Sequence, residues 1–234
     1  MTMKIYAISD LHISTNTNKP MDVFGGNWVG YLDKIRADWN EKIKDEDLVL
    51  IGGDISWAMT IEDAAKDIQT LTDLKGKKVL IKGNHDYWWS GIGKVRDMLP
   101  DGFYALQNDC IRFEGVVICG SRCWSVPGAP DFNEQDRKIY LRETERLKLS
   151  LSAAEKIRQA GDKLIALVHY PPFNVRREDS LFTEIFENNG VDVVVYGHLH
   201  GKSVRADKLV IKNGVKYYLT SCDQVDNKLT EILF

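Results

Sequence analysis

The sequence lacks several features that would assign it to a specialised class of protein. No apolar run approaches the length needed to span a bilayer, and the four cysteines form neither a C-x-x-C pair nor a dense framework. The net charge of −3 at pH 7 provides no general attraction to nucleic acid or to acidic membranes. These absences argue against a membrane-spanning protein, a disulfide-stabilised secreted domain and a nucleic-acid-binding protein.

The same features indicate the cellular compartment and the number of domains. A strand-like segment at residues 4–8 begins almost at the amino terminus and leaves no room for a signal peptide. Cys110, Cys119 and Cys222 lie in or beside apolar segments, where buried free thiols are common. We therefore expect a cytoplasmic protein with reduced cysteines. The 234 residues contain no internal repeat, low-complexity tract or linker, which predicts a single domain over residues 1–234.

The first half of the sequence alternates short apolar segments with amphipathic ones. The apolar segments at residues 4–8, 48–51 and 79–81 predict strands. The amphipathic segments predict a helix over residues 28–43 with Asn27 as a candidate cap, a helix that begins at Thr60 with Asp63 three residues later, and a short helix that ends at Pro100. This order predicts a parallel sheet with right-handed crossovers.

The second half has a different pattern, with a hairpin, a long helical region and several further strands. Residues 110–113 and 116–120 predict a hairpin around Glu114-Gly115. After an irregular stretch, polar helical sequence extends to about Gln159, with a second helix start predicted at Ser152-Ala-Ala-Glu155. Residues 164–168 and 191–196 predict two buried strands, which flank a helix that ends at Asn189-Gly190. Residues 209–212, 216–220 and 230–233 predict three further strands, and an Asn213-Gly214 turn joins the first two.

The sequence contains only five histidines, and each lies in a short polar motif that directly follows a strand-like segment. Carboxyl ends of parallel strands meet at one rim of a sheet, so these side chains are expected to converge. Imidazole nitrogens and carboxylate oxygens suit borderline divalent metals, and their number suits two ions better than one. Taken singly, His12 or His169 could equally be a structural histidine. Together they predict a two-metal hydrolase, with the motifs Asp10-Leu11-His12, Gly52-Gly53-Asp54, Gly83-Asn84-His85-Asp86, His169-Tyr170-Pro171-Pro172 and Gly197-His198-Leu199-His200.

Taken in order across residues 10–200, these motifs resemble the pattern of the calcineurin-like metallophosphoesterase family, which is D-x-H, G-D, G-N-H-D, H and G-H-x-H. The resemblance implies an α/β fold, a four-layer α-β-β-α sandwich with two mixed β-sheets. It implies two divalent or mixed-valence metal ions, for which Mn, Fe and Zn all suit the ligand atoms. The implied ligands are Asp10, His12 and His200 for one ion and Asn84, His169 and His198 for the other, with Asp54 bridging both.

The resemblance also implies a role for the two residues after Asn84. In the family, the residue at the position of His85 donates a proton to the leaving oxygen or stabilises its charge. Asp86 is expected to orient the imidazole of His85 and to favour its charged form. The implied activity is that of a dinuclear metal-dependent phosphoric ester hydrolase, in which a metal-bridging hydroxide attacks the phosphorus.

One departure from the family narrows the expected substrate. The Ser/Thr protein phosphatase branch continues its G-D motif as G-D-x-V-D-R-G, whereas here residues 55–59 contain neither that aspartate nor that arginine. This disfavours a protein phosphatase and favours a small phosphorylated substrate, either a phosphodiester or a phosphomonoester. The alternatives are a nuclease acting on DNA or RNA, which would need a basic groove with interleaved aromatic residues, and a non-catalytic scaffold.

Other residues near the motifs have two interpretations each. The aromatic residues could form the floor of a substrate pocket or pack beneath the loops: Trp57, Tyr87, Trp88, Trp89 and Trp124. Three arginines could clamp a phosphate or remain solvated at the surface: Arg122, Arg176 and Arg177. Residues 14–26 and 121–133 are long loops that follow strands, and we expect them to gate the site.

Overall fold

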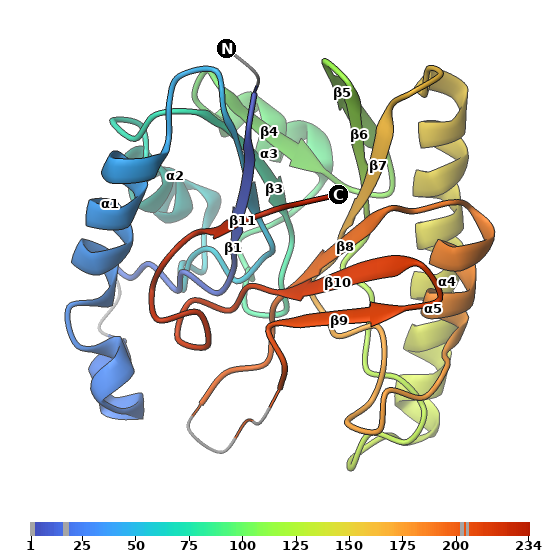
Figure 1. Cartoon of the computed structure of the whole chain (residues 1–234). Coiled ribbons are helices and arrows are strands. Elements are labelled where there is room, and N and C mark those ends of the chain that lie inside the picture. The colour runs from blue at the N-terminus through green and yellow to red at the C-terminus, as the bar shows by residue number, and fades with distance from the viewer. Residues whose placement is uncertain (1–2, 16–18, 202–203, 205) are drawn as a thin grey trace.

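The computed structural model describes residues 3–15, 19–201, 204 and 206–234, and in this part of the chain the strands form two β-sheets (Figure 1). The first sheet contains β1 (Ile5–Ile8), β2 (Leu48–Ile51), β3 (Lys77–Ile81), β4 (Phe103–Leu106) and β11 (Thr230–Glu231). Its order is β11-β1-β2-β3-β4, with only β11 antiparallel to its neighbour. Ile8 pairs with Ile51, so β1 and β2 end at the same level.

The second sheet contains β5 (Cys110–Phe113), β6 (Val116–Cys119), β7 (Lys163–Leu167), β8 (Val193–Tyr196), β9 (Leu209–Lys212) and β10 (Val215–Leu219). Its order is β5-β6-β7-β8-β10-β9. The four inner strands are parallel, and each edge strand is antiparallel to its neighbour. Both sheets are therefore mixed, and each presents a row of parallel strand ends.

Helices cover the outer face of each sheet (Figure 1). The first sheet is covered by α1 (Tyr31–Lys42), α2 (Ile61–Gln69) and α3 (Ile92–Met98), and the second by α4 (Glu134–Ile157) and α5 (Leu181–Asn188). Two short 3-10 helices, η1 (Met21–Phe24) and η2 (Gly26–Trp28), precede α1.

Three apolar layers hold the two sheets and their helices together. Side chains alternate along a strand, so Tyr6 and Ile8 pack toward the helices while Ile5 and Ala7 pack between the sheets. A third layer, which includes Phe182, joins the second sheet to α4 and α5. The structure therefore confirms the predicted four-layer α-β-β-α sandwich.

Several local predictions are confirmed. Strand β2 has the predicted bounds, and the hydroxyl of Thr60 accepts a hydrogen bond from the Asp63 N–H at the start of α2. The turn at Asn213-Gly214 has φ angles of 50° and 83°, as expected for a two-residue hairpin turn.

Other local predictions are wrong. Asn27 does not cap α1, because the short helix η2 contains it and Gly30 precedes α1. Ser152 does not begin a second helix, because α4 runs unbroken from its cap at Asn133. Leu151 and Ala154 on either side of Ser152 are buried against the second sheet, and this packing outweighs a local capping pattern. Strand β4 was not predicted.

In the part of the chain that the structure describes, no helix is long and apolar enough to cross a membrane. All four cysteines are free, as expected.

Candidate metal centre

The predicted site residues follow five parallel strands, three in the first sheet and two in the second. In the first sheet, Asp10 and His12 follow β1, Asp54 follows β2, and residues 84–86 follow β3. In the second sheet, His169 follows β7, and His198 and His200 follow β8. Because the strands end on the same side of the sandwich, residues from both sheets meet at the junction between them.

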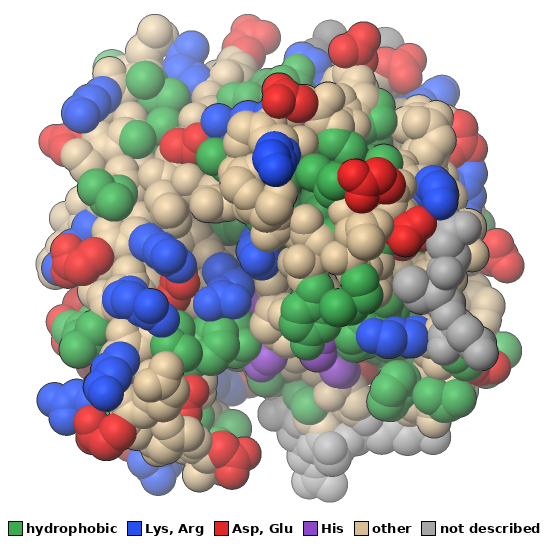
Figure 2. Space-filling view, turned by 180° about the vertical axis from the view of Figure 1, so that it is seen from behind, with side chains coloured by type: hydrophobic (Ala, Val, Ile, Leu, Met, Phe, Trp, Pro, Cys, Tyr) green, Lys and Arg blue, Asp and Glu red, His purple; other side chains and the backbone are tan. Residues whose placement is uncertain are grey.

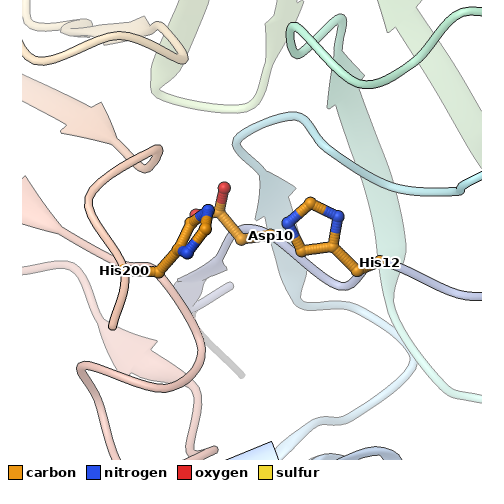
Figure 3. Close-up of side chains that lie close together, drawn as sticks. All are labelled: Asp10, His12 and His200. Carbon is orange, nitrogen blue, oxygen red and sulfur yellow. The ribbon is translucent and has the colours of Figure 1, made fainter. Parts of the chain in front are cut away.

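Two overlapping groups of these side chains are close enough to hold a metal ion. The ligand atoms of Asp10, His12 and His200 all lie within 4.8 Å of one another, and the two imidazoles flank the carboxylate of Asp10 (Figure 3). The ligand atoms of Asp10, Asp54 and His169 satisfy the same limit. Oδ2 of Asp54 lies 3.8 Å from Nε2 of His12 and 3.5 Å from Nε2 of His169, so this carboxylate lies between the two sets of predicted ligands.

The remaining predicted ligands converge on Asn84. Its Oδ1 lies 2.8 Å from Nε2 of His169 and 2.8 Å from Nδ1 of His198. The backbone N–H of His198 in turn donates to Oδ2 of Asp10 at 3.0 Å. All seven predicted ligands are therefore connected to one another within one site.

The buried atoms of this site fit a bound cation. Both ring nitrogens of His12 and Oδ2 of Asp54 are buried and have no hydrogen-bond partner among the described residues. Unpaired buried polar atoms are costly and rare in folded proteins. A divalent metal accepts imidazole nitrogen and carboxylate oxygen together, so it would satisfy these atoms.

Burial gives the histidines the neutral form that metal binding requires, whereas the ionised form of Asp10 needs a cation nearby. Burial lowers the pKa of His169 to about 3 and that of His198 to about 2, so both imidazoles are neutral near pH 7. Burial also lowers the pKa of His12 well below its ordinary range. Burial, and next the negative charge of Asp54, raise the pKa of Asp10 well above its ordinary range. A cation between the two carboxylates would remove this repulsion.

The backbone of the site adopts a conformation that is uncommon for residues other than glycine. Asp10, His12, Asp54 and His198 have φ angles of 59°, 45°, 51° and 69°. Such strain collects at functional sites, where the surrounding structure maintains it. Gly83 allows the loops to approach, because a Cβ on this residue would lie 2.0 Å from Oδ1 of Asp54.

His85 is half-buried beside the candidate ligands, with its ring centroid 5.7 Å from that of His12. Its backbone N–H donates to Oδ1 of Asp54 at 2.8 Å, and its ring centroid lies 4.5 Å from that of Trp57. Nδ1 of His85 is buried and has no hydrogen-bond partner among the described residues. Burial lowers the pKa of this imidazole, while the nearby Asp54 raises it.

The carboxylate of Asp86 is hydrogen-bonded to groups other than its predicted partner, the imidazole of His85. Its carboxylate accepts hydrogen bonds from the backbone N–H groups of Ile55, Ser56 and Gly83 and from the indole N–H of Trp88, at 2.8–3.2 Å. In the described structure, no hydrogen bond joins it to His85. Asp86 therefore links the loops after β2 and β3, because the unpaired backbone donors of two tight turns require a buried acceptor. The expectation that it orients His85 is corrected.

The aromatic residues divide between the two interpretations. Trp88 and Trp89 are buried and pack beneath the loops. Trp57 stacks on His12, with ring centroids 4.8 Å apart, and lines the site. Tyr87 is exposed, and Trp124 packs against Tyr170, with centroids 4.8 Å apart.

Sequence reasoning missed two residues beside the candidate ligands. The ring of Tyr170 lies 4.1 Å from that of His198, and its position directly after His169 was the available signal. Asp223 is buried and accepts a hydrogen bond from the N–H of Gly201, next to His200, at 2.7 Å. No pattern in the sequence pointed to it.

The three candidate phosphate-binding arginines also differ. Arg176 pairs with Glu178 and Arg177 with Asp207, at the surface. Arg122 is half-buried and lies in the loop after β6, where its carbonyl accepts hydrogen bonds from the N–H groups of His169 and Tyr170. Only Arg122 is therefore attached directly to a predicted ligand.

The two long loops both border the site. Of residues 14–26, positions 16–18 lie outside the described residues, and Sδ of Met21 accepts a hydrogen bond from the indole of Trp57 at 3.2 Å. Residues of the 121–133 loop, including Val126 and Ala129, line an apolar cavity of about 390 Å³ that reaches Tyr170 and His198.

Comparison with known proteins is consistent with this geometry. The model of the calcineurin-like phosphoesterase family matches residues 3–202. No curated protein sequence matches the chain. A solved structure of a protein of unknown function from Aquifex aeolicus aligns over 98% of this chain and 96% of its own, with 18% identity and a TM-score of 0.53. TT1561 of Thermus thermophilus aligns over 99% of both chains, with 12% identity and a TM-score of 0.62. These two likenesses support the fold.

Proposed function

The chain belongs to the calcineurin-like phosphoesterase family, and we propose that it is a dinuclear metal-dependent enzyme that hydrolyses a phosphodiester or a small phosphomonoester. The observation that carries this proposal is the convergence of seven predicted ligands from two sheets around buried atoms of His12 and Asp54 that have no hydrogen-bond partner in the described part of the chain. A structural role would leave those atoms unsatisfied.

In this proposal Asp10, His12 and His200 would hold one ion and Asn84, His169 and His198 the other, with Asp54 as a ligand shared between them. The supporting geometry is the two overlapping groups that share Asp10 and the contacts of Asn84 with both His169 and His198. Two divalent ions bound there supply the charge that polarises a phosphate and lower the pKa of water toward neutrality.

The remaining chemistry belongs to side chains of the protein. His85 donates a proton to the leaving oxygen as the P–O bond breaks, and its ring, held beside Trp57 and not engaged by Asp86, is available to do so. Asp86 acts as a positioning residue that ties the Asp54 loop to the Asn84 loop. The apolar cavity beside His198 suits the organic part of an ester.

The structure around Asp54 is also relevant to the protein phosphatase alternative. The backbone N–H groups of Ile55 and Ser56 bind Asp86, and the hydroxyl of Ser56 binds the carboxylate of Asp67. These residues are buried and supply no cation to a substrate. This supports a small ester over a phosphoprotein as the substrate.

The test is a panel of esters offered to the purified full chain with Mn²⁺, Fe²⁺ or Zn²⁺. The panel contains bis(p-nitrophenyl) phosphate, p-nitrophenyl phosphate, cyclic nucleotides, and single- and double-stranded oligonucleotides. We expect metal-dependent turnover of small esters, about two bound ions per chain by elemental analysis, and a lower unfolding temperature in a chelator. Wild-type protein that holds metal and hydrolyses no ester would disprove the proposal, and turnover of oligonucleotides alone would replace it with a nuclease.

A further inference from the structure

A second, polar pocket lies at the same end of the sandwich as the candidate metal centre and contains an excess of positive charge. Its volume is about 260 Å³, and its charged lining residues are Lys82, Arg122, Glu143 and Arg146. Gln107 and Ser121 add polar groups. We call this the basic pocket. Liquid water occupies about 30 Å³ per molecule, so the pocket can hold one phosphate group with some of its water.

The charges of the basic pocket are not balanced internally. Oε1 of Glu143 lies 2.6 Å from Arg146 and 3.5 Å from Arg122, so one carboxylate serves two guanidinium groups. Nζ of Lys82 donates to the carbonyl of Trp89 at 2.9 Å and has no carboxylate partner among the described residues. Three cations therefore face one anion.

Several of these side chains are already held in place. The side chain of Glu143 is 2% exposed, which anchors both arginines from inside the fold. The guanidinium of Arg122 also lies over the ring of Trp124, with its central carbon 4.5 Å from the ring centroid. Preorganised cations lose less conformational entropy when they bind an anion than free surface side chains do.

The basic pocket is connected to the candidate metal centre through two chain segments. Lys82 precedes the predicted ligand Asn84 by two residues on the same loop. The carbonyl of Arg122 accepts hydrogen bonds from the N–H groups of His169 and Tyr170. Figure 2 shows Lys and Arg side chains gathered in a hollow of the surface beside histidine side chains. The basic pocket and the candidate metal centre are therefore neighbours in the structure.

We propose that the basic pocket binds a second phosphate group of the substrate, and that the preferred substrates are small organic molecules that carry two phosphates. This inference rests on the proposed phosphoesterase function for the first phosphate. Guanidinium groups bind phosphate through paired, charge-assisted hydrogen bonds. The small volume of the pocket and the net charge of −3 favour a small molecule over a polynucleotide.

The test compares ligands that differ only in the second phosphate. Alkanediol bisphosphates of increasing chain length, and the matched alkanol monophosphates, are titrated calorimetrically into the full chain loaded with Mn²⁺. At the best chain length we expect the bisphosphate to bind at least about tenfold more tightly than the monophosphate. Arg146→Gln should reduce this ratio several-fold, because it leaves only two cations in the pocket.

Arg137→Gln is the matched control. Arg137 lies on α4 like Arg146, and each pairs with a glutamate three residues earlier, but Arg137 does not line the basic pocket. The control removes the same charge from the protein and should keep the ratio. Lys82→Gln provides a second pocket variant if Arg146→Gln unfolds, which circular dichroism would reveal.

The outcomes separate this inference from the function on which it rests. A ratio near one at every chain length, or a ratio that Arg146→Gln and Lys82→Gln both leave intact, overturns the basic pocket even if esters are hydrolysed. The predicted ratios in a protein that hydrolyses no ester support the pocket and overturn the enzyme. If Arg146→Gln weakens oligonucleotide binding but not bisphosphate binding, the small-molecule substrate is wrong.

Discussion

Oδ1 of Asn84 lies 2.8 Å from Nδ1 of His198, although the two residues are 114 positions apart in the sequence. Asn84 follows β3 of the first sheet, and His198 follows β8 of the second. The candidate metal centre therefore exists only where the two sheets face each other, and its stability depends on the apolar layer between them.

His85→Ala should separate proton donation from metal binding. It should leave the metal content unchanged, because His85 is not among the proposed ligands. Turnover of an ester with a poor alkoxide leaving group should fall about 10²–10⁴-fold, whereas a nitrophenyl ester, whose leaving group needs little protonation, should lose much less. Steady-state kinetics on both esters check this. Asp54→Asn is the control, and it should lose metal and both activities together. Equal losses on the two esters in His85→Ala would make His85 a charge stabiliser rather than an acid.

Asp86→Ala should destabilise the whole fold. It leaves four buried N–H donors without their acceptor, those of Ile55, Ser56, Gly83 and Trp88. We expect the free energy of unfolding to fall by about 3–5 kcal/mol, measured by urea denaturation. The adjacent His85→Ala should change it by about 1 kcal/mol or less. A stable Asp86→Ala protein that has lost only turnover would instead favour a direct partnership with His85.

Gly83→Ala should disturb the position of Asp54. The added methyl group would lie 2.0 Å from Oδ1 and 2.2 Å from the backbone N of Asp54, so the loop after β2 must move. We expect reduced metal content by elemental analysis and a loss of about 1–3 kcal/mol of stability.

Gly93→Ala is the matched control for Gly83→Ala. Gly93 lies in α3, where an added Cβ meets no atom within 4 Å. Alanine has the higher helix propensity, so this variant should keep its metal and gain up to about 1 kcal/mol. Similar metal content in the two variants would contradict the close approach of Gly83 to Asp54.

Asp162 should contribute stability that depends on pH. Its carboxylate accepts hydrogen bonds from Arg112 at 2.7 and 3.0 Å and from the N–H of Gln159 at 2.8 Å, and the bonds from Arg112 are the main cause of its lowered pKa. The folded pKa is below the unfolded value of about 3.9. The stabilisation is therefore complete above that value and is lost as the pH falls through the folded pKa.

Urea denaturation of wild type and Asp162→Asn across a pH series checks this prediction. The variant should be less stable at pH values well above the ordinary aspartate range, and the difference should shrink as the solution becomes more acidic. Asp45→Asn, at an exposed aspartate, controls for the general loss of a negative charge. A difference that stays constant throughout the series would mean that Asp162 does not act through its ionised form.

Local structure and the chemistry of the candidate site could be predicted from the sequence because both depend on neighbouring residues. The apolar segment at Leu48–Ile51 forms a buried strand, and Thr60 caps a helix through a residue three positions later. His12 and Asp54 follow strands, so their arrival at one rim depends on the direction of parallel strands rather than on detailed packing.

Only the tertiary structure determines the contacts between segments that are distant in the sequence. Ser152 lies inside α4 because burial of Leu151 and Ala154 on the second sheet outweighs a local capping pattern. Asp86 binds backbone donors of another loop rather than the adjacent His85, because the two tight turns leave those donors buried. The basic pocket combines side chains that follow β3 and β6 with two from α4, Glu143 and Arg146. No local pattern specifies such a combination, because it follows from which strand faces which once the apolar layer between the sheets has formed.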